Sequence, residues 1–156
     1  MNLDANVFDV WVFRRTPAGT EYLLLHASQL KADRFFNGGR FWQIPCGVVA
    51  GDEGIVPAID GLLARFGLTA SAVWAAEHVY TIYNRRFARM QIIGVFAAEV
   101  SAEVVRLDPH EHAEFRWCSF DDALRAVTFR GLKEGLQSTR EYVTGRAAPP
   151  PELQLR

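Results

Sequence analysis

The stretch that decides the fold is FWQIPCGVVAGDEGIVPAIDGLLARFGL, which runs from Phe41 to Leu68. It opens with a short apolar segment and a turn at Pro45–Gly51, where proline and glycine interrupt regular structure. Apolar residues then recur at spacings of three and four across Val56–Phe66, which predicts a helix with one buried face. Gly67 follows at the position where a glycine commonly ends a helix. The stretch therefore predicts a strand, a turn, a helix and a tight stop.

The rest of the chain alternates between strand and helix patterns. Runs rich in β-branched and aromatic residues predict strands, and the apolar run after Ser119 predicts a capped helix. The predicted strands are Val7–Arg14, Tyr22–His26, Phe41–Ile44, Ala72–Tyr83, Met90–Val100 and Phe115–Cys118, and the predicted later helices are Asp121–Val127 and Gly131–Val143. Residues 27 to 40 are expected to form a polar loop. This mixture predicts an α+β fold, an α/β/α sandwich with a mixed β-sheet.

Length and composition describe one globular domain. The chain has 156 residues, of which 49% are hydrophobic and 22% charged, enough for a full core. We expect residues 1–144 to form the domain and residues 145–156, which include three consecutive prolines, to form a flexible tail. A net charge of −1 does not indicate a nucleic-acid or membrane partner, so we expect neither, and no apolar run is long enough to cross a bilayer. Two cysteines are too few for a disulfide framework, so we expect a cytoplasmic protein.

The Phe41–Leu68 stretch resembles the box of the Nudix hydrolases, the MutT-like superfamily. The pattern of that box is Gly, five residues, Glu, seven residues, then Arg-Glu-apolar-x-Glu-Glu-x-Gly-apolar. In this chain, Gly47 and Glu53 match the first spacing, and Gly67-Leu68 match the closing Gly-apolar pair. Residues 112–123 are similar to the late strand-to-helix segment of the dihydroneopterin triphosphatase-like branch. The resemblance implies the Nudix fold over residues 7–143 and hydrolysis of a phosphoanhydride in a nucleoside diphosphate derivative. It also implies Mg²⁺ or Mn²⁺ as the cofactor of an active enzyme, because polyphosphate oxygens repel an incoming water.

The box is degenerate at the positions where the family has metal-binding glutamates. With Gly67 aligned to the closing glycine, these positions are Gly61, Ala64 and Arg65. Without the one-residue deletion that this register requires, they are Leu62, Arg65 and Phe66. Neither register supplies a carboxylate, and Arg65 would repel a divalent cation by roughly 4 kcal/mol at an effective dielectric constant near 20. We therefore expect no metal at the usual ligand positions, and metal-dependent hydrolysis that is weak or lost.

Other carboxylates could take over the chemistry. Glu53 lies where the family has a supporting glutamate, and Glu114 lies where some Nudix enzymes contribute a late-loop carboxylate; these two are the candidate catalytic residues. Glu53 could instead stabilise the helix dipole, and Glu114 could belong to a solvated acidic face with Glu111. Cys46 is expected to be a small buried residue rather than a nucleophile. Surface positions are expected for His110 and His112, with no metal between them.

Basic and aromatic residues around the start of the box predict a site for phosphate and base. Arg34, Arg40 and Trp42 are the candidate substrate-binding residues. Arginine can hold a phosphate through two parallel hydrogen bonds, and an aromatic ring can stack on a base or a pterin. Further phosphate contacts could come from Lys31, Arg85, Arg86 and Arg89. The alternative is a solvated loop with ordinary core aromatics.

Three functions stay open on the sequence. The one that we favour is a divergent Nudix protein that recognises a nucleoside diphosphate-linked ligand, with metal-dependent hydrolysis weak or lost. The second is an active pyrophosphohydrolase with a rearranged metal site that uses Glu53 and Glu114. The third is a non-enzymatic interaction or regulatory module. The expected partner is a small nucleotide-like molecule, with no nucleic acid and no membrane, and a homodimer is a further possibility that the resemblance raises.

Overall fold

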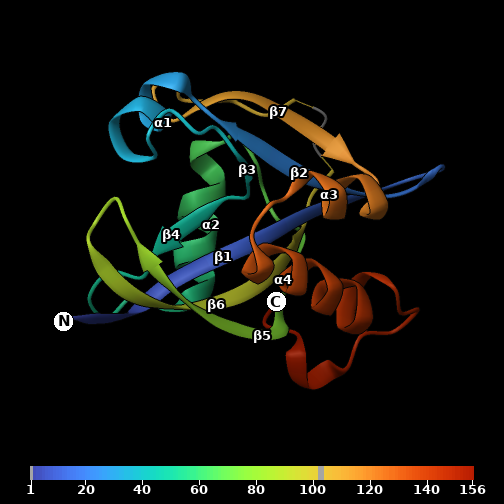
Figure 1. Ribbon diagram of the computed structural model, residues 1–156. Coiled ribbons are helices and arrows are strands. Elements are labelled where there is room, and N and C mark those ends of the chain that lie inside the picture. The colour runs from blue at the N-terminus through green and yellow to red at the C-terminus, as the bar shows by residue number, and fades with distance from the viewer. Residues whose placement is uncertain (1, 102–103) are drawn as a thin grey trace.

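The computed structural model describes residues 2–101 and 104–156, and it begins with a long β-hairpin (Figure 1). Strand β1 spans Leu3–Thr16 and β2 spans Gly19–Ala27. Their register runs from Phe13 opposite Tyr22 to Thr16 opposite Gly19. Gly19 has a φ of 132°, a conformation that a side chain would strain, so the turn depends on glycine. The hairpin predicted from the sequence is confirmed.

The strands join in one mixed sheet. The remaining strands are β3 (Trp42–Gln43), β4 (Cys46–Val48), β5 (Ala72–Asn84), β6 (Arg89–Glu99) and β7 (His112–Cys118). The main path of the sheet has the order β3-β2-β1-β6-β5, while β4 pairs with β1 and β7 pairs with β2. Strands β1 and β6 run parallel, whereas the other pairs are antiparallel. The predicted α+β fold with a mixed sheet is confirmed.

One face of the sheet is covered by helix α2, which spans Ile55–Arg65. Its apolar stripe packs in one cluster with residues of β1 and β2 such as Phe8 and Leu23. The buried residues of the helix are Ala58, Ile59, Leu62 and Leu63. Gly67, with a φ of 72°, lets the chain turn back after the helix, and the Leu68 amide donates to the Leu63 carbonyl oxygen at 3.0 Å. The helix and its stop therefore follow the sequence pattern.

The opposite face is covered by α3 (Phe120–Ala126) and α4 (Arg130–Thr139), which continues into a π-helical turn. These helices pack on a second cluster that includes Trp11, Phe13, Tyr22 and Leu24. The Ser119 hydroxyl caps α3 by accepting a hydrogen bond from the Asp122 amide at 3.2 Å. Helices on both faces of one sheet make the expected α/β/α sandwich (Figure 1). No helix within the described residues is long and apolar enough to cross a bilayer.

Residues 27 to 40 are not the polar loop that the sequence predicts, because they contain helix α1 (Gln29–Phe35). The Ser28 hydroxyl caps this helix by accepting from the Lys31 amide at 3.0 Å, and Ala32 is its buried residue. A helix of seven residues with one buried alanine has too little apolar periodicity to be recognised in a sequence. The helix matters for the site described below because it carries Lys31 and Arg34.

The end of the chain lies along β5. The Val73 amide donates to the Arg156 carbonyl oxygen at 2.9 Å, and the Leu155 amide donates to the Val73 carbonyl oxygen at 2.8 Å. The Arg156 guanidinium also reaches Asp60 on α2, with Nη2 2.9 Å from Oδ1. Flexibility of residues 145–156 and a domain boundary at residue 144 stay predictions, but the last residues have defined partners.

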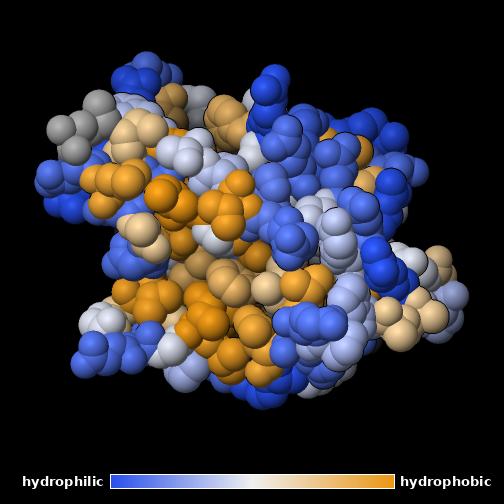
Figure 2. Space-filling view, turned by 90° about the horizontal axis from the view of Figure 1, so that it is seen from below, coloured by the Kyte–Doolittle hydropathy of each residue, from blue (hydrophilic) through white to orange (hydrophobic). Residues whose placement is uncertain are grey.

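The underside of the molecule is divided between an apolar and a polar part (Figure 2). Strand β5 is the last strand on the path of the sheet and lies at the bottom of Figure 1. It exposes two large apolar side chains, Val79 and Tyr83. An exposed apolar strand at the edge of a sheet is a surface on which another chain can pair.

Candidate functional site

The outward face of α2 carries no metal ligand. With Gly67 as the closing glycine, the positions of the metal-binding glutamates are Gly61, Ala64 and Arg65, and all three residues are exposed. A Cβ built at Gly61 would meet no atom within 4 Å. Mg²⁺ requires oxygen ligands in near-octahedral geometry, and none of these three side chains contains an oxygen. The residues present therefore do not fit a divalent cation at this position.

The neighbours of this face are basic rather than acidic. Arg106 donates through Nη2 to the Ala64 carbonyl oxygen at 3.1 Å. Asp60, the one acid of α2, is paired with Arg156. Within residues 2–101 and 104–156, no three His, Cys, Asp or Glu residues are placed to hold a metal ion together. A divalent cation at this face of the helix would be repelled by Arg65 and would find no ligand among the three positions.

Glu53 and Glu114, the predicted catalytic residues, lie in different parts of the fold. Glu53 is exposed in the turn before α2, where its amide donates to the Ala50 carbonyl oxygen at 2.9 Å. Glu114 lies on β7 opposite His26 of β2, and its Oε1 is 3.2 Å from the histidine Nδ1. Each carboxylate has its own surroundings, so a shared catalytic role stays a prediction.

Arg40 and Trp42, two of the predicted substrate-binding residues, contact the end of strand β2. Arg40 donates through Nε to the Ala27 carbonyl oxygen at 2.8 Å, and its Nη2 lies 2.9 Å from His26 Nδ1. Because a guanidinium only donates hydrogen bonds, this histidine nitrogen accepts one. The Trp42 ring stacks on His26 with centroids 4.4 Å apart, and the Arg116 guanidinium lies 4.5 Å from the tryptophan ring centroid. Their polar and aromatic groups already have protein partners.

Arg34 and Trp42 line different hollows. Trp42 borders an open groove of about 700 Å³ next to α3, whereas Arg34 lines a smaller cavity of about 220 Å³. This smaller cavity, called here the cation cavity, lies between α1, the turn that joins β5 to β6, and the loop before β7. Its lining includes Lys31, Arg34, Phe35, Arg86, His110 and Glu111. Three cationic side chains against one carboxylate make it electropositive, so it attracts anions.

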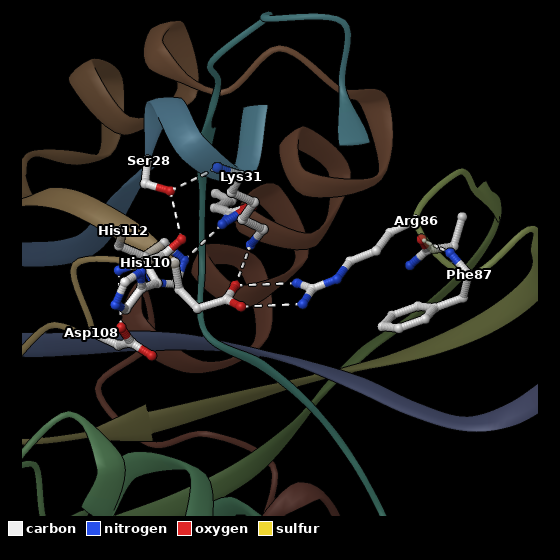
Figure 3. Close-up of polar contacts among 10 residues, drawn as sticks. Ser28, Lys31, Arg86, Phe87, Asp108, His110 and His112 are labelled. Atoms are coloured by element: carbon white, nitrogen blue, oxygen red, sulfur yellow. Dashed lines mark hydrogen bonds and ion pairs between the residues drawn. The ribbon is translucent and has the colours of Figure 1, made fainter. Parts of the chain in front are cut away.

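The carboxylate of the cation cavity, Glu111, is held by two of its cations (Figure 3). Arg86 Nη1 and Nη2 donate to Glu111 Oε2 and Oε1, each at 3.2 Å. Lys31 Nζ lies 3.0 Å from Oε2. Partial burial by itself would raise the pKa of Glu111, but the hydrogen bonds and charges of Arg86 and Lys31 outweigh it and lower the pKa to about 2. Glu111 is therefore ionised throughout the neutral range.

A buried acid and a thiol lie on the paired strands β1 and β4. Asp9 is 4% exposed, and the Tyr80 hydroxyl donates a hydrogen bond to its Oδ2. Burial raises the pKa of Asp9 to about 7, against the lowering effect of that hydrogen bond. Cys46 pairs with Asp9 across the strands. Cys46 is exposed, so the expectation that it is buried is wrong. Removal of its thiol from water, together with the nearby charge of Asp9, raises the thiol pKa to about 11. A thiol that stays protonated at neutral pH is a poor nucleophile.

His112 is not the surface residue that the sequence predicts. It is 9% exposed, and its Nε2 lies 2.7 Å from the side-chain amide nitrogen of Gln43. Burial, assisted by the charge of Lys31, lowers the pKa of His112 to about 4, so the ring is neutral at pH 7. Because an amide nitrogen only donates, this ring nitrogen accepts. The Phe66 ring, whose centroid lies 6.0 Å from that of the His112 ring, belongs to the core.

Sequence reasoning missed the Asp9–Tyr80 pair and the joint role of Lys31, Arg86 and Glu111. A signal for Asp9 was present, since it is the one charged residue in the apolar run of residues 7–13. No such signal joins the other three, because they come from distant parts of the chain. Their contact is visible only in the fold.

Comparisons with known proteins find similarity at the level of structure. No family model and no curated protein sequence matches the chain. A candidate Nudix hydrolase from Listeria monocytogenes is similar with a TM-score of 0.74 and 19% identity, over 93% of this chain and 98% of that one. A C. elegans Ap4A hydrolase is similar with a TM-score of 0.68 and 19% identity, over 90% and 98%. The Nudix domain of Shewanella oneidensis NrtR, complexed with ADP ribose, has a TM-score of 0.69 and 16% identity, over 92% and 90%.

Proposed function

Because the chain has the fold of the Nudix hydrolases, we propose that it binds a nucleoside diphosphate-linked ligand through its phosphate groups in the cation cavity. We also propose that metal-dependent hydrolysis by the box helix is weak or lost. One observation supports each statement. Lys31, Arg34 and Arg86 gather around one cavity. The α2 positions Gly61, Ala64 and Arg65 supply no oxygen ligand for a cation.

The side chains of the cation cavity match the chemistry of a phosphate. An arginine holds two oxygens with its parallel N–H groups, and a lysine adds a compact charge. Arg86 already holds a carboxylate in this manner. The volume of about 220 Å³ is smaller than the roughly 300–1,000 Å³ of sites that enclose whole ligands. The cavity would therefore take the phosphates and leave the rest of the ligand outside.

Two of the structural neighbours support the class of ligand by their names. The Shewanella domain is complexed with ADP ribose, which contains a diphosphate, and the C. elegans protein is an Ap4A hydrolase. A rearranged metal site at Glu53 and Glu114, a requirement for Mg²⁺ or Mn²⁺ and a cytoplasmic location stay predictions. A homodimer is also a prediction, and the exposed apolar side chains of β5 support it.

Binding of ADP, measured by calorimetry in the presence of EDTA, tests the proposal. We expect saturable binding by the wild type and binding about tenfold weaker by Arg34→Met, because a hydrogen bond to a charged group contributes roughly 1.5–3 kcal/mol. Arg125→Met is the matched control, since Arg125 is 73% exposed on α3 and lies outside the cation cavity. Absence of saturable binding, or an equal loss in the two variants, would rule out this cavity as the ligand site.

A further inference from the structure

The cation cavity is lined by one carboxylate, that of Glu111. Its carboxylate accepts from both Nη groups of Arg86, and the Lys31 ammonium lies 3.0 Å from Oε2. The two cations reach it from the β5–β6 turn and from α1 (Figure 3). One carboxylate therefore already contacts two of the three cations that line the cavity before any ligand arrives.

These contacts have the geometry of phosphate recognition. Two parallel N–H···O bonds from one guanidinium, with an ammonium group beside them, are how arginine and lysine hold a phosphate. The Glu111 carboxylate presents two oxygens to the same fork of Arg86. It thus occupies the positions that two oxygens of a ligand phosphate would take.

The Glu111 side chain can leave without disturbing its own backbone. The Glu111 carbonyl oxygen accepts from the Ser28 amide at 3.0 Å, and the Glu111 amide donates to the Asp108 carbonyl oxygen at 3.0 Å. These bonds do not involve the carboxylate. Because the side chain is 31% exposed, rotation about its own bonds carries the carboxylate into water. Lys31 and Arg86 are carried on α1 and on the β5–β6 turn, and the Arg86 guanidinium also lies 4.6 Å from the centroid of the Phe35 ring. Arg86 therefore keeps a second partner in the cavity when the carboxylate leaves.

We infer that Glu111 is a built-in competitor, whose carboxylate holds Lys31 and Arg86 in the free protein and is displaced by a ligand phosphate. The inference rests on the proposed function, because it concerns the same cavity. A ligand that must displace an internal group binds more weakly than it would to a free site. Its apparent association constant is the intrinsic one multiplied by the fraction of molecules in which the internal group has left. A singly charged anion gains little over Glu111, whereas a pyrophosphate group carries more charge to the same cations. Glu111 therefore makes the cavity selective for polyanionic phosphates.

Pyrophosphate binding by Glu111→Gln tests the inference. Glutamine keeps the size of the side chain and removes its charge. By calorimetry in EDTA, we expect this variant to bind pyrophosphate about tenfold more tightly than the wild type, a coupling of ordinary size in proteins. Its melting temperature without ligand should fall, because the pairs with Arg86 and Lys31 are lost. A purely structural role would lower the melting temperature and the affinity together.

Glu134→Gln is the matched control, because it removes a half-exposed carboxylate of α4 that lies 3.9 Å from His78 and does not line the cation cavity. Its affinity for pyrophosphate should equal that of the wild type. Glu111→Asp, with a shorter carboxylate, should show intermediate affinity and keeps the test decisive if Glu111→Gln does not fold. Unchanged or weaker binding by the Glu111 variants, when the wild type binds, would overturn the inference and leave the proposed function standing. No binding by any form would overturn both.

Discussion

Asp9 is a carboxylic acid enclosed in the sheet, and burial determines its ionisation. Its pKa rises from an ordinary value of 3.8 to about 7 in the folded protein. Between these two values the folded state holds a proton that the unfolded state has released. An acid with a raised pKa stabilises the fold fully below the unfolded value, and this contribution is lost as the pH rises through 7.

Asp9→Asn should therefore change how stability depends on pH. Asparagine keeps an oxygen that can accept from the Tyr80 hydroxyl, but it has no proton to lose. We expect the free energy of unfolding of the wild type, relative to this variant, to fall between about pH 5 and pH 8 by an amount on the order of a few kcal/mol. Urea unfolding of both proteins at the two pH values measures it. A difference that stays constant with pH would contradict the assignment.

At the scale of elements, α4 approaches β5 so closely that Gly131 has no room for a side chain. A Cβ there would lie 2.3 Å from two ring carbons of Tyr80, whose hydroxyl is bonded to Asp9. Gly131→Ala should lower the free energy of unfolding by about 1–3 kcal/mol. Gly61→Ala, on the open face of α2, is the matched control and should raise it by about 0.5–1 kcal/mol. Thermal unfolding measures both, and shifts of the same sign would contradict the packing described.

The elements also show how far sequence reasoning reaches. The β1–β2 hairpin and α2 are predictable because turn residues and apolar spacing are local signals. Helix α1 is missed because its pattern is short and polar. The candidate site is harder, since Lys31, Arg86 and Glu111 meet only through the tertiary fold. Arg34 and Trp42, which are close in sequence, line separate hollows for the same reason.

The whole molecule keeps the Nudix fold, while the positions of the box's metal ligands hold Gly61, Ala64 and Arg65. The sheet and its helices bring α1, the β5–β6 turn and the loop before β7 around the cation cavity. Cationic side chains bind phosphate without a metal ion. In the proposed function, ligand recognition by the cavity is therefore independent of metal-dependent hydrolysis at α2.

One measurement tests this independence most directly: incubation of the wild type with a panel of nucleoside diphosphate derivatives, in Mg²⁺, in Mn²⁺ and in EDTA, with binding and product followed together. We expect the same saturable binding in all three conditions and no metal-dependent release of product. Metal-dependent turnover that is abolished by Glu53→Gln or Glu114→Gln would contradict it and would establish a rearranged metal site.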